Sequence, residues 1–317
     1  MDISIVIPVY NEEESLPELC TWIERVVREN RISHEIILVD DGSTDRSWEV
    51  IQELRQSNPN IKGIRFQRNY GKSAALNEGF KASKGEVVIT MDADMQDSPD
   101  EIPALRNMIL EEKFDMVSGW KKVRHDPISK TLPSKFFNWT TARVSHIPLH
   151  DFNCGLKAYR NKVVKSIEVY GEMHRYIPVI AKWAGFRRIG EKAVQHRARK
   201  YGHTKFGGLG RGLKGLLDLA SITFVGKYGK RPMHFFGPLG VICGLIGLGE
   251  TISLIVQKLD NRPSFSLTNK PAFYIALTCV VLGMQLFLTG FMAELISRNS
   301  PGRNSYLIEQ KLGLDHQ

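Results

Sequence analysis

The stretch ISIVIP, residues 3–8, is a short and nearly continuous apolar run, and the polar segment VYNEE follows at once. Three further apolar runs of strand length lie at residues 35–39, 63–66 and 87–91. Segments with the spacing of amphipathic helices follow the four runs, at residues 13–30, 43–56, 72–82 and 99–111. Because Ile- and Val-rich strands that alternate with helices are typical of sheets covered on both faces, the sequence predicts an α/β domain with a Rossmann-like, mostly parallel sheet.

Acidic residues collect where the predicted strands end. Ligands of such sheets bind beyond the carboxyl ends of the strands, so these residues form a candidate site. Asp92 and Asp94 stand one residue apart after the fourth strand, and two such carboxylates repel each other unless a cation or hydrogen-bond donors hold them. Mg²⁺ usually binds one or two carboxylates together with substrate phosphates. We therefore expect a divalent cation that carries a diphosphate.

Two other phosphate-binding motifs do not fit the sequence. Gly71-Lys72-Ser73 ends like a Walker A motif, but Phe66 stands where that motif requires its first glycine. No GxGxxG follows any of the predicted strands, which argues against a nicotinamide or flavin enzyme.

A basic block and two apolar segments make up the rest of the chain. Residues 120–232 hold 24 Lys and Arg against 6 Asp and Glu, whereas the remainder holds 19 against 28. Such a block suits a nucleic acid, an anionic membrane surface or a phosphorylated substrate. Residues 235–256 contain Glu250 as their one charged residue, and residues 272–293 contain none. Because a spanning helix needs about 20 apolar residues, we predict two transmembrane helices; the alternative, a pair of buried core helices, is usually shorter and less uniformly apolar.

The membrane segments define the predicted organisation of the chain. Lys and Arg flank the pair on both outer sides, so we expect the soluble domain and both termini on the cytoplasmic side of the membrane. Glu250 is expected to face the other helix or a partner subunit, which makes a homo-oligomer through these helices a further prediction. Residues 207–228 are expected to form an amphipathic helix that lies in the membrane interface, and the alternative is a glycine-rich linker. The predicted parts are a soluble domain at 1–206, a juxtamembrane amphipathic segment at 207–232, two membrane helices within 233–296 and a cytoplasmic tail at 297–317.

Seven motifs together have a specific resemblance. IPVYNEE (7–13), VDDGSTD (39–45), RNYGKSAALNEG (68–79) and MDADMQD (91–97), in this order, resemble the inverting family 2 glycosyltransferases of GT-A fold. HDFNCGLKAYR (150–160), GEMHRYIP (171–178) and HRARKYGHTKFG (196–207), followed by two membrane segments, resemble the branch that moves a sugar from a nucleotide donor to a polyprenyl phosphate. That branch includes GtrB-type bacterial glucosyltransferases and dolichyl-phosphate mannose synthases. The QxxRW motif of processive synthases is missing after Gln195, which argues against a chain-elongating enzyme.

The resemblance implies roles on the donor side. The expected donor is UDP-glucose, with GDP-mannose, UDP-GlcNAc and a UDP-aminoarabinose-type sugar as alternatives. Lys72 is expected to add to donor binding, and the alternative for it is a solvated lysine at a helix start. The nucleoside pocket is expected at Pro8, Tyr10, Asn11, Glu12, Asp40 and Asp41, with Asp92 and Ala93 beside the donor and Mg²⁺ or Mn²⁺ on Asp92, Asp94 and Gln96.

An anionic lipid-phosphate acceptor would account for the excess of Lys and Arg in the basic block, residues 120–232. A lipid phosphate, with a second pKa near 6, is anionic at neutral pH, so it needs cationic capture and orientation more than a strong general base. Asp151 matches an acidic position that the family places beside the acceptor, and it is expected to be either a base or an orienting group. A membrane-tethered nucleic-acid binder is the rival class, but it leaves the acidic strand ends unexplained and the block has no RNA-binding motif. The candidate acceptor residues are Arg124, Ser134, Lys135, Arg197, Arg199, Lys200 and Lys205.

Overall fold

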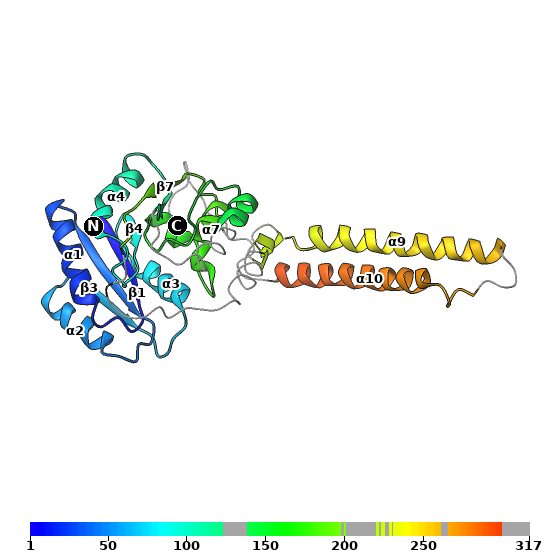
Figure 1. Cartoon of the computed structure of the whole chain (residues 1–317), viewed down its shortest axis with the longest axis horizontal. Helices are drawn as coiled ribbons and strands as arrows, with labels where there is room; N and C mark the ends of the chain where they lie inside the picture. The colour runs from blue at the N-terminus through cyan, green and yellow to red at the C-terminus, as the bar shows by residue number, and fades with distance from the viewer. Residues whose placement is uncertain are drawn as a thin grey trace, which may run out of the picture. The chain divides into compact units, whose positions relative to one another are not determined.

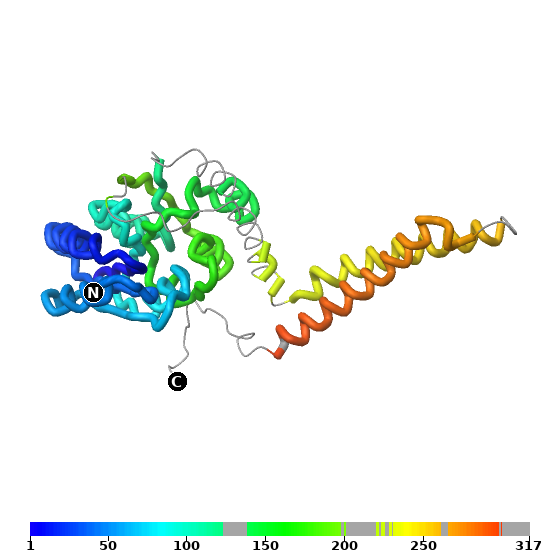
Figure 2. The backbone as a smooth tube through the Cα atoms, turned by 60° about the horizontal axis from the view of Figure 1, so that its bottom comes forward, coloured from blue at the N-terminus to red at the C-terminus, as the bar shows by residue number. Residues whose placement is uncertain are grey.

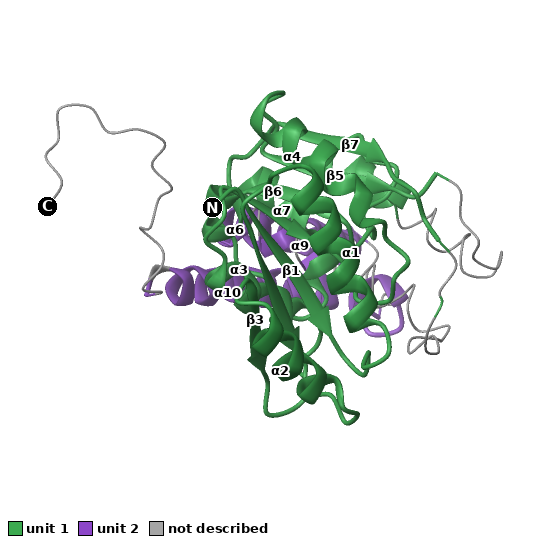
Figure 3. Ribbon diagram, turned by 90° about the vertical axis from the view of Figure 1, so that its left-hand side faces the viewer, with its two compact units in different colours: residues 1–219 green, residues 220–317 purple. Residues whose placement is uncertain are grey.

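The computed structural model describes residues 1–122, 138–197, 200, 220–221, 223–225, 228–229, 231–260 and 266–299. The chain divides into two compact units, Met1–Leu219 and Ala220–Gln317 (Figure 3). Most of the predicted juxtamembrane segment and nearly all of the predicted tail lie outside the described residues. Five candidate acceptor residues also lie outside them: Arg124, Ser134, Lys135, Arg199 and Lys205.

A seven-stranded, mostly parallel sheet forms the centre of the first unit (Figure 1). The order across the sheet is β3-β2-β1-β4-β6-β5-β7, and β6 is antiparallel to both of its neighbours, whereas the other paired strands are parallel. The predicted α/β class with a mostly parallel sheet is therefore confirmed. The strands are β1 (Ile3–Val9), β2 (His34–Asp40), β3 (Ile61–Arg65), β4 (Val87–Thr90), β5 (Met116–Trp120), β6 (Lys157–Arg160) and β7 (Ile189–Ala193).

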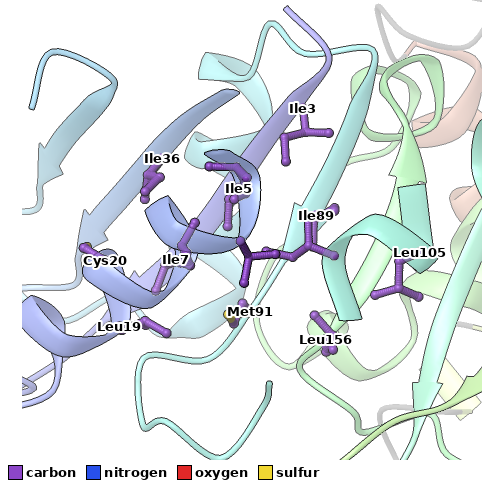
Figure 4. Close-up of a cluster of buried hydrophobic side chains, with 14 of the residues drawn as sticks. Ile3, Ile5, Ile7, Leu19, Cys20, Ile36, Ile89, Met91, Leu105 and Leu156 are labelled. Carbon is purple, nitrogen blue, oxygen red and sulfur yellow. The ribbon is translucent and has the colours of Figure 1, made fainter. Parts of the chain in front are cut away.

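Helices cover both faces of this sheet. Successive side chains of a strand point to opposite faces, so Ile3, Ile5 and Ile7 pack into one buried cluster (Figure 4) and Val6 packs into another. Because both faces are covered, the strands are near-continuous apolar runs. The first cluster includes residues of α1 (Leu16–Glu29), α2 (Ser47–Ser57) and α4 (Ile102–Leu110), and the second those of α3 (Lys72–Ala82), α6 (Asn161–Ser166) and α7 (Ile177–Trp183).

Several observed elements differ in their bounds from the expected ones. The helix expected at residues 43–56 begins at Ser47, and the strand expected at residues 63–66 is β3, Ile61–Arg65. The helix expected from residue 13 begins at Leu16, since Pro17 occupies its first turn, where a missing N–H breaks no helical hydrogen bond. The helix expected at residues 99–111 is divided into a 3₁₀ turn, η1 (Pro99–Glu101), and α4. A second 3₁₀ turn, η2 (Met173–Arg175), lies before α7.

Three neighbouring strands place the candidate site. β2, β1 and β4 are adjacent and parallel, so their carboxyl ends and the loops that follow lie at one edge of the sheet. The loop after β2 turns at Gly42, whose φ is +69°, and a Cβ there would overlap the backbone of Arg68. That glycine lets the loop after β2 lie directly against the loop after β3.

Two long apolar helices make up most of the described part of the second unit. α9 (Met233–Asp260) and α10 (Pro271–Arg298) lie side by side (Figures 1 and 2) and contain the predicted spans 235–256 and 272–293. Both are long and apolar enough to cross a membrane, and 17% of each apolar window is buried, which is too little for core helices of a soluble protein. Glycines bring them close, since a Cβ on Gly283 would lie 2.6 Å from the backbone N of Gly244. Glu250 is half-buried on α9.

Candidate active site

The carboxyl edge of the sheet brings the predicted donor residues together. The end of β4 packs against the turn before β6, because Thr90 Oγ1 donates a hydrogen bond of 2.8 Å to the carbonyl oxygen of Gly155. The predicted donor residues form four groups: Pro8 near the end of β1 with Tyr10, Asn11 and Glu12 after it, Asp40 and Asp41 at the end of β2, Lys72 at the start of α3, and Asp92, Ala93, Asp94 and Gln96 after β4.

Asp92 lies in a confined, positively charged environment. Its Oδ1 accepts a hydrogen bond from Lys72 Nζ, and its carboxylate lies against Gly155, where any Cβ would overlap it. Burial alone would raise the pKa of Asp92, but the charges of Lys72, Lys121 and Lys157 lower it to about 2. Asp92 is therefore an anion that already attracts cations.

The residues of the loop after β4 fit a divalent metal ion. Met95 has a left-handed φ of +61°, which is uncommon for a residue with a side chain, and the turn lets the backbone N–H of Gln96 donate to Asp94 Oδ1 at 3.2 Å. Asp92, Asp94 and Gln96 offer the hard oxygen atoms that Mg²⁺ and Mn²⁺ prefer, and the ammonium group of Lys72 already occupies a cation position on Asp92. Among the described residues, no three His, Cys, Asp or Glu side chains form a metal site alone, as expected where substrate phosphates supply the other ligands.

Hydrogen bonds order the loops after β1 and β2. Asn11 accepts the backbone N–H of Thr44 at 2.8 Å and donates its own N–H to Ser43 Oγ at 2.9 Å. Asp40 accepts the N–H of Ser43 at 2.9 Å, and Arg65 Nε lies 3.4 Å from its other oxygen. The contacts of Asn11 connect the two loops directly.

Asp41 holds the loop that leads into α3. Its carboxylate accepts the backbone N–H groups of Tyr70 at 2.7 Å and Gly71 at 2.9 Å. Burial raises the pKa of Asp41, although these two N–H groups act in the opposite direction. Because Asp41 fixes Gly71, it also fixes the backbone from which Lys72 extends.

Two lysines that the sequence analysis did not single out, Lys121 and Lys157, act electrostatically on Asp92. Lys121 Nζ lies 3.1 Å from the buried carboxylate of Asp97, and the charge of Asp97 raises the pKa of Lys121 despite burial. Lys157, on β6, is 4% exposed and donates a hydrogen bond to the carbonyl oxygen of Cys154. Burial lowers the pKa of Lys157, and the charges of Asp151 and Asp92 oppose that shift.

His174 contacts Ser73, the residue that follows Lys72. The Oγ of Ser73 accepts the backbone N–H of His174 at 3.0 Å and lies 3.1 Å from its Nδ1. Burial and the nearby charge of Lys72 lower the pKa of His174 well below its usual value, so the imidazole is neutral. Neutral His174 thus adds no positive charge to that of Lys72, Lys121 and Lys157.

Asp151 lies in a turn that is hydrogen-bonded to Glu191 of β7 and not in the loops after β1, β2 and β4. Its side chain is buried and accepts the backbone N–H of Asn153 at 3.0 Å. Glu191, on β7, accepts the backbone N–H of Asp151 at 3.2 Å and lies 2.7 Å from Nδ1 of His150, whose ring stacks on Trp120 at 4.3 Å. Glu191 is thus a positioning residue for the turn that carries Asp151.

Two of the candidate acceptor residues contact α1 in the structure. The guanidinium of Arg197 lies 4.2 Å from the ring centroid of Trp22, and Lys200 Nζ lies 2.7 Å from a carboxylate oxygen of Glu18. The backbone N–H of Arg197 also donates to the carbonyl oxygen of Gln96 at 2.9 Å. The segment with Arg197 and Lys200 therefore lies against the loop of the paired aspartates.

The residues missed from the sequence share one property. Lys121, Lys157, His174 and Glu191 follow none of the four strands expected from the sequence and belong to no short metal or phosphate motif. Lys157 and His174 do lie inside two of the motifs quoted above, HDFNCGLKAYR and GEMHRYIP. That membership was the one signal that could have found them, since their approach to Asp92 depends on tertiary contacts.

Relatives of known function match nearly the whole chain. It is 34% identical over 305 residues to a dodecaprenyl-phosphate galacturonate synthase of Rhizobium johnstonii, with 94% of this chain and 88% of the relative covered. It is 33% identical over 298 residues to an undecaprenyl-phosphate 4-deoxy-4-formamido-L-arabinose transferase of Pseudomonas aeruginosa, with 93% and 85% covered. Both relatives are named for sugar transfer to a polyprenyl phosphate.

Solved structures show the same fold at low identity. Glucosyl-3-phosphoglycerate synthase of Mycobacterium tuberculosis, in complex with Mn²⁺ and UDP-glucose, matches with a TM-score of 0.54 and 19% identity over 69% of this chain and 80% of that one. Mannosyl-3-phosphoglycerate synthase of Rubrobacter xylanophilus matches with a TM-score of 0.58 and 14% identity over 71% and 74%. These matches confirm the GT-A fold that the motifs implied.

The family assignment rests on two independent matches. The model of glycosyl transferase family 2 matches residues 4–168, which contain the loops after β1, β2 and β4 together with β6 and Asp151. The polyprenyl-phosphate transferases match beyond this range, across more than nine-tenths of the chain. This chain, with its paired aspartates at the carboxyl edge of a GT-A sheet, therefore belongs to glycosyl transferase family 2.

Proposed function

We propose that this protein transfers a single sugar from a nucleotide sugar to a polyprenyl phosphate at the cytoplasmic face of a bacterial inner membrane. The observation that carries the proposal is the full-length similarity to two enzymes of this class, in a chain whose second unit holds two apolar helices. The acidic edge of the sheet supports the donor half of the reaction. The basic block supports the acceptor half, since it follows that edge in the chain and precedes the helices.

On the donor side, each group of residues has a task. Pro8, Tyr10, Asn11, Glu12, Asp40 and Asp41 would line the nucleoside pocket, and Ala93 would lie beside the donor. Asp92, Asp94 and Gln96 would hold Mg²⁺ or Mn²⁺, which when bound supplies charge neutralisation for the leaving nucleoside diphosphate. Lys72, which lies beside Asp92, would donate a hydrogen bond to the diphosphate.

On the acceptor side, the chemistry needs orientation. A phosphate oxygen attacks the anomeric carbon, and the bond from that carbon to the diphosphate breaks, with inversion at the carbon. Asp151, fixed by Glu191 and by its own turn, would orient the acceptor or a cation that binds it. Arg124, Ser134, Lys135, Arg197, Arg199, Lys200 and Lys205 remain the candidates for holding the lipid phosphate.

The donor sugar is inferred to be a uronic acid or a 4-modified pentose. The two relatives act on galacturonate and on 4-deoxy-4-formamido-L-arabinose by name, which favours these sugars over the glucose expected from the sequence. UDP is the expected nucleotide.

A donor screen tests the proposal. The full-length protein in detergent receives undecaprenyl phosphate, Mg²⁺ and one labelled donor at a time: UDP-galacturonate, UDP-4-deoxy-4-formamido-L-arabinose, UDP-glucose, UDP-GlcNAc or GDP-mannose. We expect label in the lipid extract with one of the first two. Label in the lipid with UDP-glucose alone would restore the original donor prediction, and no lipid product from any donor would contradict the proposed function.

A further inference from the structure

Lys72 holds a position on Asp92 that a metal ion also requires. Its ammonium group donates a hydrogen bond to Asp92 Oδ1, and the two side chains are 31% and 29% exposed. The pair therefore lies at the surface of the site and not in its interior. A lysine on a carboxylate oxygen and a divalent cation on the same oxygen exclude each other.

The surrounding charges make a bare divalent cation a poor competitor for this position. Lys121 and Lys157 act on Asp92 in addition to Lys72, and Lys157 is buried in the sheet next to it. A free metal ion that approaches Asp92 thus meets the ammonium group of Lys72 on the carboxylate oxygen and the charge of buried Lys157, whereas Lys121 is paired with Asp97. Like charges repel strongly where water is partly excluded. A metal ion that already carries a diphosphate brings compensating negative charge.

Lys72 is the partner that can move. The carboxylate of Asp92 is confined, because it lies directly against Gly155, where a Cβ would overlap Asp92 Oδ2. Lys72 has a flexible four-carbon stem and is the first residue of α3, whose first turn contains no acidic residue. A cation at the positive end of a helix dipole is favourable only when an anion lies nearby. Asp92 supplies that anion at rest, and a donor diphosphate would supply a stronger one.

We propose that Lys72 is an exchangeable counterion: at rest it neutralises Asp92 in place of the metal ion, and on donor binding it transfers its hydrogen bond to the diphosphate and frees Asp92. The metal ion consequently enters the site together with the diphosphate and not before it. The inference rests on the proposed function for the existence of a metal–diphosphate site at Asp92 and Asp94, and it adds the order in which that site fills.

The exchange has a thermodynamic consequence. Nucleoside diphosphate and metal ion must strengthen each other's binding, and by linkage the factor is the same in both directions. Lys72 contributes to that factor twice, because it opposes the metal ion alone and favours the diphosphate once the metal ion is present. Removal of the lysine should therefore move the two affinities in opposite directions.

Mn²⁺ binding to the resting protein tests the first half. Full-length protein in detergent is titrated with Mn²⁺ without nucleotide, and free Mn²⁺ is followed by electron paramagnetic resonance. Lys72→Met should tighten Mn²⁺ binding by about tenfold or more, and Lys72→Gln should do the same. Lys72→Arg, which keeps the charge, should bind Mn²⁺ as weakly as the wild type. Lys81→Met is the matched control, since Lys81 lies on the same helix and pairs with Glu78 at 2.7 Å, at an exposed position.

UDP binding at saturating Mn²⁺ tests the second half. Lys72→Met should weaken UDP binding by about tenfold, and Lys81→Met should leave it unchanged. Equal or weaker Mn²⁺ binding by Lys72→Met and Lys72→Gln would overturn the exchange, and so would wild-type protein that binds Mn²⁺ as tightly without UDP as with it. A melting temperature close to that of the wild type confirms that each variant is folded.

A failure of the exchange is distinguishable from a failure of the proposed function. The Mn²⁺ and UDP titrations involve neither the sugar nor the lipid, so they give the same answer whichever donor is used. If Asp94→Asn binds Mn²⁺ normally in the presence of UDP, the metal site itself is wrong. If Asp94→Asn loses Mn²⁺ while Lys72→Met shows no gain, the site stands and the exchange alone is refuted.

Discussion

At the scale of single residues, the balance of charge around Asp92 decides what the site can hold. Asp92 and Asp94 offer the metal-binding oxygens, and Lys72, Lys121 and Lys157 surround the first of them. The lysines keep Asp92 ionised, so it is ready to bind a cation at any physiological pH.

The first prediction concerns Asp94. Loss of a residue that supports a metal ligand typically costs 10–100-fold, so Asp94→Asn, which removes a proposed ligand itself, should reduce sugar transfer by about 100-fold or more. Asp100→Asn is the control, since Asp100 is a half-exposed carboxylate on η1 that contacts Arg25. Transfer is measured as labelled lipid product, with and without EDTA. Normal transfer by Asp94→Asn, or wild-type transfer that EDTA does not affect, would refute the metal assignment.

The second prediction separates the two roles of Asp151. A positioned general base contributes about 100-fold or more, and its loss matters less at high pH, where the acceptor phosphate, with a second pKa near 6, is fully dianionic. Because Asp151 is buried and bonded to its own turn, we expect it to orient, so that the loss of kcat in Asp151→Asn stays constant between pH 6 and 9. A pH–rate profile in which the loss shrinks steadily as pH rises would identify a base instead.

At the scale of elements, the contact between β4 and the turn before β6 shapes the site. β6 is antiparallel to β4, with Lys157 opposite Thr90, and this pairing brings Gly155 against the carboxylate of Asp92. The two strands are 67 residues apart along the chain at this pair. The donor loop is therefore supported by a segment from the later half of the domain.

The third prediction tests that support. In Gly155→Ala the added methyl group would overlap the Asp92 carboxylate, and a misplacement of about 1 Å in a catalytic constellation can cost about 100-fold in rate. We expect a loss of that size in kcat together with weaker binding of Mn²⁺–UDP. Gly249→Ala is the control, because no atom lies within 4 Å of a Cβ at that glycine. Unchanged Mn²⁺–UDP affinity in Gly155→Ala would show that Asp92 is not confined there.

At the scale of the whole molecule, charge and apolarity follow the order of the proposed reaction. The acidic donor residues lie in the first third of the chain, the basic block follows, and the two apolar helices come last. The proposed reaction would use these parts in turn as a donor site, a phosphate-binding region and an attachment to the bilayer in which a polyprenyl acceptor dissolves.

The fourth prediction concerns the basic block. If arginines of this block hold the lipid phosphate, Arg124→Ala and Arg199→Ala should each raise the KM for undecaprenyl phosphate by about tenfold, with little change in the KM for the nucleotide sugar. Arg55→Ala, on the exposed end of α2, should change neither. Equal effects on both substrates, or no effect, would show that these arginines do not serve the acceptor.

The sequence by itself determined the fold class and the acidic edge of the sheet. Near-continuous apolar strands and the acidic residues that follow them are local patterns, and parallel neighbours necessarily place their carboxyl ends at one edge. Asp40, Asp41, Asp92 and Asp94 could therefore be predicted as a group. The two apolar helices could also be predicted, because their length and composition match what a bilayer requires of a spanning helix.

The tertiary structure alone decided which cations meet these carboxylates. Lys157 lies on β6, which is inserted antiparallel beside β4, and Lys121 follows β5, which pairs with β6. The contact between Ser73 and η2 places neutral His174 next to Lys72. Short, partly polar strands such as β6 have no distinctive periodicity, and contacts across tens of residues leave no local pattern in a single sequence. The charge balance of the site follows from those contacts, and so does the proposed exchange of Lys72 between Asp92 and the donor.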